Sequence, residues 1–334
     1  MTEIFCLLKV RKIPFRCNGT KSAVRILFLH LGHNYTIFSP ATERYKTHAL
    51  GMITRAYAKI NLGLRIIGKR PDGYHDIETV LHRVNVFDEI TLEPASSVTI
   101  ECQQQNVPND ATNLCVRAVV LFQKLHTIRD GIRIILKKHI PVGAGLGGGS
   151  SDAAATLRLL TRFWNKPTTE RDLQLLALQL GSDVPFFLND GSAYAKGRGE
   201  ILEYFELDIP YWIVTVYPNL HISTAWAYRE TQISNRKSDD TVKKIIQEHI
   251  TQPRLLMNLL QNDFEPLVLR THEPVARVKQ ALYIAGAEFA QMSGSGSAVY
   301  GLFSDELFVH DVAKELGKHY AVFLTPPHFQ PGTE

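Results

Sequence analysis

The sequence predicts a globular protein of mixed strands and helices, without the repeating strand–helix pattern of a parallel α/β fold. Three segments carry this prediction: an alternating apolar pattern that begins at Ala56, a glycine-rich loop at 141–151, and an apolar stripe of helical spacing over 168–180. The chain has 334 residues, of which 45% are apolar and 21% charged, as is typical of globular proteins. This length suits one large domain or two packed ones.

Composition and charge exclude several classes of protein. No run approaches the ~18–20 apolar residues that span a membrane, so a membrane partner is not expected. The net charge of +4 is too small to indicate a nucleic-acid partner. Four cysteines without a CxxC pair are too few for a disulfide framework and favour a cytoplasmic location. No segment of the sequence marks an interface between subunits.

Residues 1–51 differ from the rest of the chain in charge. They contain eight Lys or Arg and two Glu, a balance of +6 that leaves −2 for residues 52–334. The segment has no clear amphipathic period, no small-residue cleavage site, and few of the serines of a transit peptide. We therefore expect a basic leader that is unstructured, an upstream-start or accessory extension. An organelle-targeting leader is the alternative.

The patterned chain begins with an alternating segment. Every second residue over 58–66 is apolar, which predicts a strand with Lys59 and Asn61 side by side on its open face. The strand ends at a turn over residues 69–73. A lone lysine on a strand is usually a solvated residue, so a functional role for Lys59 depends on the segments that follow.

The next elements follow from pattern and composition. Alternation predicts strands, and the 3.6-residue apolar period predicts helices. The expected strands are Glu89–Pro94, Val98–Cys102 and Gly131–Lys138, and the expected helices are Leu114–Leu125, Asp152–Leu160 and Thr168–Leu180.

A glycine-rich loop joins a predicted strand to the start of a predicted helix. Glycines let backbone N–H groups turn toward a ligand, and a helix N-terminus adds unpaired donors and a positive dipole end. The loop lacks the Gly-Lys-Ser/Thr ending of a Walker A sequence and is not the dinucleotide fingerprint. Phosphate binding is favoured over a flexible connector, because linkers are rarely flanked by a strand and an Ala-rich helix. The predicted phosphate-binding residues are Pro141, Val142, Gly143, Ala144, Gly145, Leu146, Gly147, Gly148, Gly149, Ser150 and Ser151.

Asp183 follows the predicted helix that ends at Leu180, and it precedes Pro185. An Asp in this position commonly caps a short helix. In a phosphoryl transferase, a carboxylate among apolar residues can instead accept the proton of a substrate hydroxyl. A nearby ammonium such as Lys59 would hold that carboxylate ionised. Both interpretations stay open at this point.

Together, three segments resemble the GHMP kinase superfamily: Lys59-Ile60-Asn61, the glycine-rich loop, and the segment around Asp183. The late turn Met292–Ser297 is similar to the third motif of that superfamily. Within it, Arg70–His75 and Asn262–Pro266 resemble a branch that phosphorylates a cytidine-diphosphate-linked methylerythritol in non-mevalonate isoprenoid synthesis. The resemblance covers roughly residues 52–330.

This resemblance implies an ATP-dependent kinase that phosphorylates the 2-hydroxyl of the methylerythritol unit, with Mg²⁺ as second cofactor. Asp183 would be the general base and Lys59 its partner. Ser151, Asp183 and the ATP phosphates are candidates for holding Mg²⁺, and none is assigned as a ligand. The implied substrate-binding residues are Asn61, Tyr74, His75, Tyr228, Gly294, Ser295 and Gly296, with Trp226 as an alternative to Tyr228 for stacking on cytosine.

The same resemblance implies an α+β fold of two lobes with the active site in the cleft between them. We expect the ATP-binding first lobe at 52–209 and the second lobe at 210–334. Another kinase of the superfamily, acting on mevalonate, homoserine or galactose, would lack the segment 72–75. A non-catalytic sensor with this fold would be expected to lack Lys59 or Asp183, and both are present.

Overall fold

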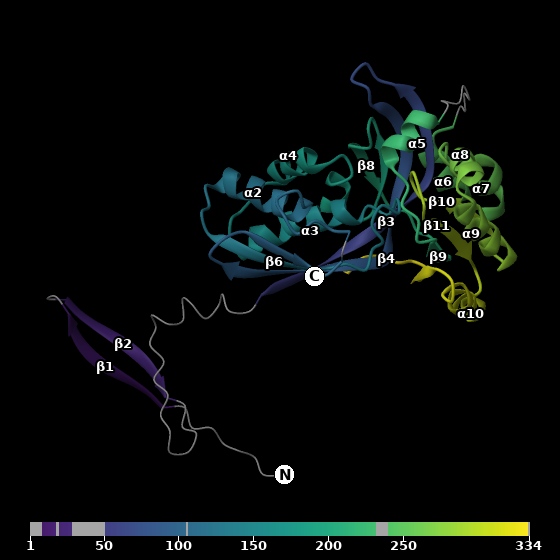
Figure 1. Ribbon diagram of the computed structural model, residues 1–334. Coiled ribbons are helices and arrows are strands. Elements are labelled where there is room, and N and C mark those ends of the chain that lie inside the picture. Colours follow the sequence, from purple (N-terminus) through teal and green to yellow (C-terminus); the bar gives the residue numbers. More distant parts are fainter. Residues whose placement is uncertain (1–8, 18–19, 29–50, 105, 232–239, 333–334) are drawn as a thin grey trace, which may run out of the picture. The chain divides into compact units, whose positions relative to one another are not determined.

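The computed structural model describes residues 9–17, 20–28, 51–104, 106–231 and 240–332 (Figure 1). The chain divides into two units, Met1–Gly51 and Met52–Glu334. Each unit is described by itself.

The basic leader contains two strands, β1 (Lys9–Cys17) and β2 (Thr20–Phe28), which pair antiparallel with Lys9 opposite Phe28. This hairpin differs from the unstructured leader that the sequence predicts. Residues 24, 26 and 28 are Val, Ile and Phe, a β-favouring alternation that is too short to stand out in a basic segment. The rest of the leader lies outside the described residues, and its role stays a prediction.

The first sheet of the second unit is built around one long antiparallel hairpin, β3 (Met52–Lys69) and β4 (His75–Ala95). The other strands are β5 (Thr99–Cys102), β6 (Gly131–Lys137), β7 (Ser192–Lys196) and β8 (Ile201–Phe205). Their order is β5-β6-β4-β7-β8, with β3 paired to β4 off this path. Only β5 and β6 run parallel among these described pairs. The three strands expected over 89–138 are present, the first as part of the longer β4.

The helices of this part of the chain are α2 (Leu114–His126), α3 (Gly148–Phe163), α4 (Glu170–Leu180) and the 3₁₀ turn η1 (Pro185–Leu188). Their apolar stripes pack against the sheet, so that Phe122, Leu157 and Phe186 share one core with Ile90 and Ile134. Helix α3 starts four residues before the expected Asp152, because the helix begins within the glycines themselves.

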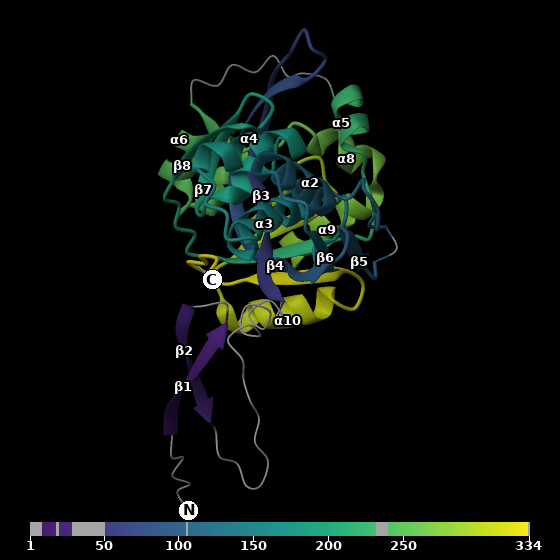
Figure 2. The same ribbon diagram turned by 90° about the vertical axis from the view of Figure 1, so that its left-hand side faces the viewer.

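The described residues from Trp212 onward form a second sheet with accompanying helices. It contains β9 (Trp212–Tyr217), β10 (Phe289–Met292), β11 (Val299–Phe303) and β12 (Ala321–Thr325), all antiparallel in the order β10-β11-β9-β12. The accompanying helices are α5 (Thr224–Glu230), α6 (Val242–His249), α7 (Pro253–Leu259), α8 (Glu265–Thr271), α9 (Glu273–Ile284) and α10 (Glu306–Leu316). Figure 2 shows the first sheet and its helices packed together with the second sheet and its helices.

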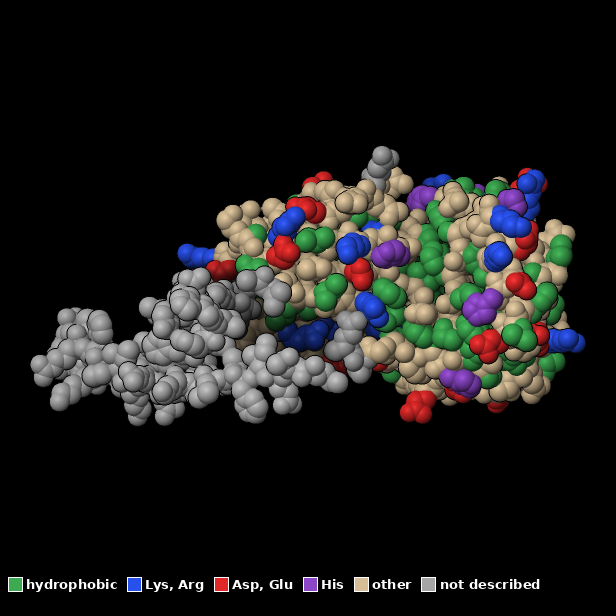
Figure 3. All heavy atoms as spheres, turned by 90° about the horizontal axis from the view of Figure 1, so that it is seen from below, with side chains coloured by type: hydrophobic (Ala, Val, Ile, Leu, Met, Phe, Trp, Pro, Cys, Tyr) green, Lys and Arg blue, Asp and Glu red, His purple; other side chains and the backbone are tan. Residues whose placement is uncertain are grey.

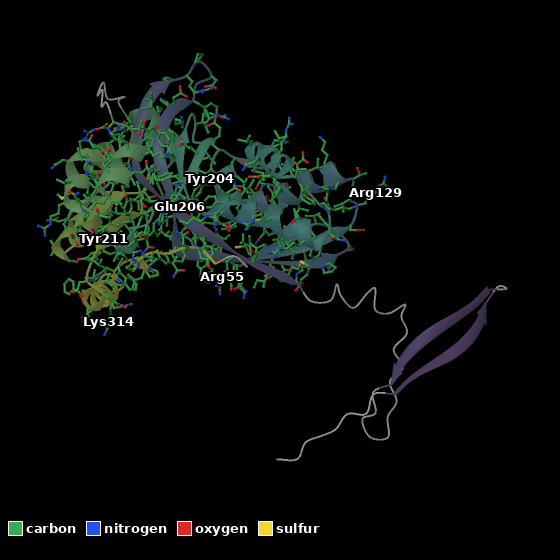
Figure 4. The ribbon with its side chains drawn as sticks, turned by 180° about the vertical axis from the view of Figure 1, so that it is seen from behind. Arg55, Arg129, Tyr204, Glu206, Tyr211 and Lys314 are labelled. Atoms are coloured by element: carbon green, nitrogen blue, oxygen red, sulfur yellow. The ribbon has the colours of Figure 1, made fainter. Side chains whose placement is uncertain are left out.

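The two sheets share an apolar core, in which Ile60 of β3 lies with Ile246 of α6 and Tyr300 of β11. The second sheet begins at Trp212, close to the lobe boundary expected at Pro210. Seen from behind, Arg129 marks the outer end of the first lobe and Lys314 of α10 that of the second (Figure 4).

No helix among the described residues is long and apolar enough to cross a membrane. On the face seen in Figure 3, the described Lys and Arg side chains are interspersed with Asp, Glu and His.

Candidate active site

A cavity of about 450 Å³ gathers residues from both lobes. Its lining includes residues of β3, the glycine-rich loop, the segment before η1 and the β7–β8 turn. It also includes residues of α5 and of the β10–β11 turn, and Phe264, which directly precedes α8. The predicted site residues that line it are Lys59, Asn61, Pro141, Val142, Gly143, Ala144, Gly145, Gly147, Gly148, Gly149, Ser150, Asp183, Tyr228, Gly294 and Ser295.

Lys59 and Asn61 are adjacent, as predicted, but the expected open face of the strand is wrong. Each residue is only 4% exposed, because the glycine-rich loop and the β10–β11 turn lie against this face of β3. Lys59 Nζ donates to Asn61 Oδ1 at 2.5 Å and to the Gly145 carbonyl at 2.8 Å. Burial lowers the pKa of Lys59, and the charge of Asp183 opposes this shift. The Lys59 side chain is therefore held in a buried site where the charge of Asp183 acts on it.

A chain of hydrogen bonds joins β3, the glycine-rich loop and the turn between β10 and β11. The backbone N–H of Asn61 donates to Ser293 Oγ at 3.1 Å, and Ser293 Oγ donates to the Gly145 carbonyl at 2.9 Å. Gly145 has φ +77°, and a Cβ there would lie 2.1 Å from the Ser293 carbonyl oxygen. Glycine is required at this position by both its backbone conformation and its close approach to the late turn.

The N-terminus of α3 opens onto the cavity. Its N-cap residue, Gly147, has φ +70° and provides no side-chain hydrogen bond to the first turn. Gly148, Gly149 and Ser150 line the cavity directly after it. Unpaired N–H groups and the positive dipole end at this point suit an anionic ligand such as a phosphate chain.

Five predicted contact residues do not line the cavity: Tyr74 and His75, which are described below, and Leu146, Ser151 and Gly296. Leu146 is 1% exposed in the apolar core, and its carbonyl accepts from the Lys59 backbone N–H at 3.0 Å. Ser151 is 2% exposed, and its Oγ donates to the Tyr57 carbonyl at 2.7 Å, so this hydroxyl holds α3 against β3. Gly296 faces Met292 and Ile222. Leu146, the Ser151 hydroxyl and Gly296 therefore face protein atoms, and their contact with a ligand stays a prediction.

A buried charge cluster beside the loop was missed by the sequence interpretation. Lys138 Nζ donates to Asp152 Oδ2 at 2.7 Å and also to Asp88 Oδ2. Asp88 Oδ1 accepts from the backbone N–H groups of His139 and Ile140, at 2.5 and 2.9 Å. The only available signal was an Asp in the first turns of the helix and a Lys at the end of the preceding strand. Their separation in sequence hid the pairing.

Burial and charge act against each other in this cluster. Burial raises the pKa of Asp152 well above its ordinary value, Asp88 adds to this shift, and Lys138 opposes it. Burial lowers the pKa of Lys138, but the two carboxylates outweigh it and the pKa is raised. Asp152 Oδ1 has no hydrogen-bond partner among the described residues, although Asp152 lines the cavity.

Asp183 lies at the cavity and does not cap η1. The N-cap position belongs to Val184, and no side-chain hydrogen bond caps this turn. Asp183 Oδ1 lies 3.7 Å from the position of a Cβ built on Gly199, which places the β7–β8 turn beside this carboxylate. The capping interpretation of Asp183 is therefore not supported, and its carboxylate is available to a ligand.

The predicted aromatic residues lie at the edge of the cavity. Tyr228 lines it and stacks on His75, with ring centroids 4.9 Å apart and planes 16° apart. Trp226 instead contacts His272 edge-on. Tyr74 is 55% exposed, and its ring faces Arg198, whose Cζ lies 5.0 Å from the ring centroid. Tyr74 and His75 do not line the cavity themselves. Arg198 does line it, and the sequence interpretation missed this residue as well.

Comparison with known families agrees with this arrangement. Residues 113–191 match the family described as GHMP kinases N terminal domain, and residues 241–322 match GHMP kinases C terminal. The first match contains the glycine-rich loop and Asp183, and the second covers α6 to β12. A crystal structure of a homoserine kinase from Cytophaga hutchinsonii has the same fold at 17% identity and a TM-score of 0.63, covering 82% of this chain and 95% of that one.

More similar proteins narrow the family further. A protein of Prosthecochloris aestuarii named 4-diphosphocytidyl-2-C-methyl-D-erythritol kinase is 46% identical over 278 residues, which cover 82% of this chain and 97% of that protein. A protein of the same name from Chlorobium phaeobacteroides is 44% identical, with 82% and 97% covered. A crystal structure of 4-(cytidine 5'-diphospho)-2C-methyl-D-erythritol kinase is 33% identical with a TM-score of 0.70, and covers 82% of this chain and 98% of that one. With this identity over nearly the whole length of its relatives, and with the motifs gathered at one cavity, the chain belongs to the 4-diphosphocytidyl-2-C-methyl-D-erythritol kinase family of GHMP kinases.

Proposed function

We propose that this chain transfers the γ-phosphoryl group of ATP to the 2-hydroxyl of 4-diphosphocytidyl-2-C-methyl-D-erythritol, a step in isoprenoid precursor synthesis. One observation carries the proposal: Lys59, Asn61 and Asp183 line the same cavity as the uncapped N-terminus of α3. A substrate hydroxyl beside Lys59, Asn61 and Asp183 would face a phosphate chain at the N-terminus of α3 across that cavity. Such placement supplies much of the catalysis in phosphoryl transfer.

In this proposal, Asp183 accepts the proton of the substrate hydroxyl as the hydroxyl oxygen attacks the γ-phosphorus. The bond from that phosphorus to the β–γ bridging oxygen breaks, and ADP leaves. Lys59 stabilises the negative charge that develops, because its ammonium is fixed by Asn61 Oδ1 and the Gly145 carbonyl and needs no reorganisation. Its burial makes this electrostatic effect larger than it would be in water.

The glycine-rich loop and the first turn of α3 would hold the ATP phosphates through backbone N–H groups. The donor set also fits Mg²⁺, which commonly takes one or two protein carboxylates together with substrate phosphates. Asp183 and Asp152 line the cavity, and Asp152 Oδ1 has no protein partner among the described residues. When bound, Mg²⁺ would neutralise phosphate charge.

His75 and Tyr228 are proposed to bind the cytosine. Burial and the nearby Lys69 lower the pKa of His75, so its ring is neutral at pH 7 and offers one donor and one acceptor to the edge of a base. Tyr228 is held edge-on by Phe264, with centroids 4.8 Å apart, and lines the cavity, where an aromatic ring can contact a base. The predicted cytoplasmic location is part of this proposal, and the free, buried Cys102 and Cys115 are compatible with it.

An ATP-dependent phosphorylation assay with four alcohols tests the proposal: the cytidine substrate, mevalonate, homoserine and galactose. The full chain is compared with a chain that starts at Met52. We expect turnover of the cytidine substrate alone, at equal rates for both chains. Turnover of another alcohol would keep the superfamily but overturn the roles of His75 and Tyr228. ATP binding without turnover of any alcohol would indicate a non-catalytic sensor.

A further inference from the structure

The substrate in the proposed function carries a diphosphate, and the cavity must balance its charge. Among the described residues that line the cavity, three have positively charged side chains: Lys59, Lys138 and Arg198. Lys59 lies beside Asp183, which acts on its pKa, and Lys138 is paired with Asp88 and Asp152. Arg198 pairs with Glu200 through Nε alone, so its two Nη groups are the cationic donors best placed to take a further anion.

The contacts of Arg198 leave most of its side-chain donors without an acceptor among the described residues. Its backbone N–H donates to Glu200 Oε2 at 2.6 Å, and its Nε donates to Glu200 Oε1 at a long 3.4 Å. No described residue accepts a hydrogen bond from either Nη group, and the side chain is 34% exposed. A guanidinium has four N–H donors on its two Nη atoms, arranged to bind two phosphate oxygens at once.

The position of Arg198 matches the chemical order of the substrate. On one side, its guanidinium faces Tyr74, next to His75 at the proposed cytosine end. On the other side, the following residue, Gly199, lies beside Asp183 at the end where the hydroxyl reacts. The diphosphate of the substrate joins these same two ends, the cytidine and the methylerythritol.

The backbone that carries Arg198 is fixed. The Gly199 N–H donates to the Lys196 carbonyl at 3.0 Å and closes the turn between β7 and β8. The Ile77 N–H donates to the Gly197 carbonyl at 2.7 Å, which ties this turn to β4. Because the turn is held at both points, the guanidinium is presented to the cavity at a small entropic cost.

We propose that Arg198 binds the diphosphate of the cytidine substrate and selects for a substrate that carries one. This inference rests on the proposed function. Lys196 provides a matched control, since it lies in the same hairpin and carries the same charge, but its Nζ lies over the Tyr194 ring and it does not line the cavity.

The test compares Arg198→Ala, Arg198→Lys and Lys196→Ala with the unaltered chain in steady-state kinetics. Hydrogen bonds to a charged group predict that Arg198→Ala raises KM for the cytidine substrate ~10–100-fold. KM for ATP is expected to stay within about twofold. Arg198→Lys should recover part of the loss, because an ammonium keeps the charge without the two-pronged geometry. Lys196→Ala should leave both constants unchanged.

A second measurement compares inhibition by CDP and by cytidine, which differ in the diphosphate alone. The unaltered chain should bind CDP more tightly, and Arg198→Ala should lose most of that preference while its affinity for cytidine is kept. Loss of affinity for both ligands, a raised KM for ATP, or an equal effect of Lys196→Ala would overturn the role of Arg198. If the unaltered chain does not phosphorylate the cytidine substrate, the proposed function itself fails, and this result is distinct from the others.

Discussion

Lys138 Nζ lies 2.7 Å from Asp152 Oδ2, so one ion pair joins the chain before the glycine-rich loop to the helix after it. Asp88 binds the same ammonium and also accepts two backbone N–H groups at the entry of the loop. The loop is therefore clamped at both ends and attached to β4. This clamp sets the positions of the backbone donors that face the cavity.

Breaking the clamp should destabilise the protein. Lys138→Met removes the one ammonium and leaves Asp88 and Asp152 buried together, a change that typically costs about 3–5 kcal/mol. We expect a clearly lower Tm and weaker ATP binding, measured by thermal unfolding and nucleotide titration. The loss of stability should shrink as the pH falls, because protonation removes the unpaired charges. Arg277→Gln is the control, since its pairing with Glu273 is at the surface, and a similar drop in Tm there would contradict the clamp.

The role of Asp183 as general base predicts a large effect on turnover. Asp183→Asn keeps the size of the side chain and removes its capacity to accept a proton. We expect kcat to fall ~10²–10⁴-fold while nucleotide affinity stays nearly unchanged. Rapid-quench turnover and a separate ATP titration measure the two effects. A variant with near-normal kcat would remove Asp183 from this role.

Tyr228 and Trp226 are two residues apart in α5 but differ in their surroundings. Tyr228 lines the cavity, whereas Trp226 packs against His272. Loss of an aromatic stacking partner costs about 1–3 kcal/mol per base, so Tyr228→Ala should raise KM for the cytidine substrate ~10–100-fold. Trp226→Ala should change KM little. The opposite ranking in the same kinetic assay would assign the cytosine to Trp226.

His82 should make stability depend on pH. It is 5% exposed, its Nδ1 lies 2.7 Å from Ser192 Oγ, and burial lowers its pKa from 6.5 to about 4. The imidazole of His82 binds a proton more readily in the unfolded chain than in the folded one. The free energy of unfolding is therefore unaffected by this group above pH 6.5 and decreases as the pH falls from 6.5 toward 4. The difference between the two pKa values of His82 corresponds to about 3 kcal/mol in the free energy of unfolding.

Urea unfolding of the unaltered chain and of His82→Gln between pH 4 and 7 measures this effect. Part of the decline below pH 6.5 should disappear in the variant, whereas His319→Gln, at the surface, should follow the unaltered chain. Identical pH profiles for the unaltered chain and His82→Gln would contradict the prediction.

His82 and Ser192 line a second cavity, of about 280 Å³, together with Tyr204 and Glu206, which are labelled in Figure 4.

Local pattern was sufficient for much of the fold. The alternation over 58–66 and the helical stripe over 168–180 correspond to β3 and α4, since both periods depend only on which residues face the core. The strand–loop–helix order around 141–151 likewise placed backbone donors at one helix N-terminus. The glycine conformations there depend on local sterics, which the sequence expresses directly.

Other features could not be read from local pattern, because they depend on contacts between segments far apart in the chain. Alternation put Lys59 on the polar face of its strand, but the glycine-rich loop and the β10–β11 turn lie against that face and bury it. The exposed-strand interpretation of Lys59 was wrong for this reason. In the same way, Ser151 looked available as a hydroxyl, and the approach of β3 uses it as a structural donor.

The sequence by itself determined the class of fold, the position of the glycine-rich loop and the choice of Lys59 and Asp183 as candidate reacting groups, because these follow from periodicity and from motifs of contiguous residues. Only the tertiary structure decided the burial of Lys59, the pairing of Lys138 with Asp88 and Asp152, and the place of Arg198 at the cavity. Burial and pairing set the charge of each group, and both arise from contacts between residues far apart in the chain.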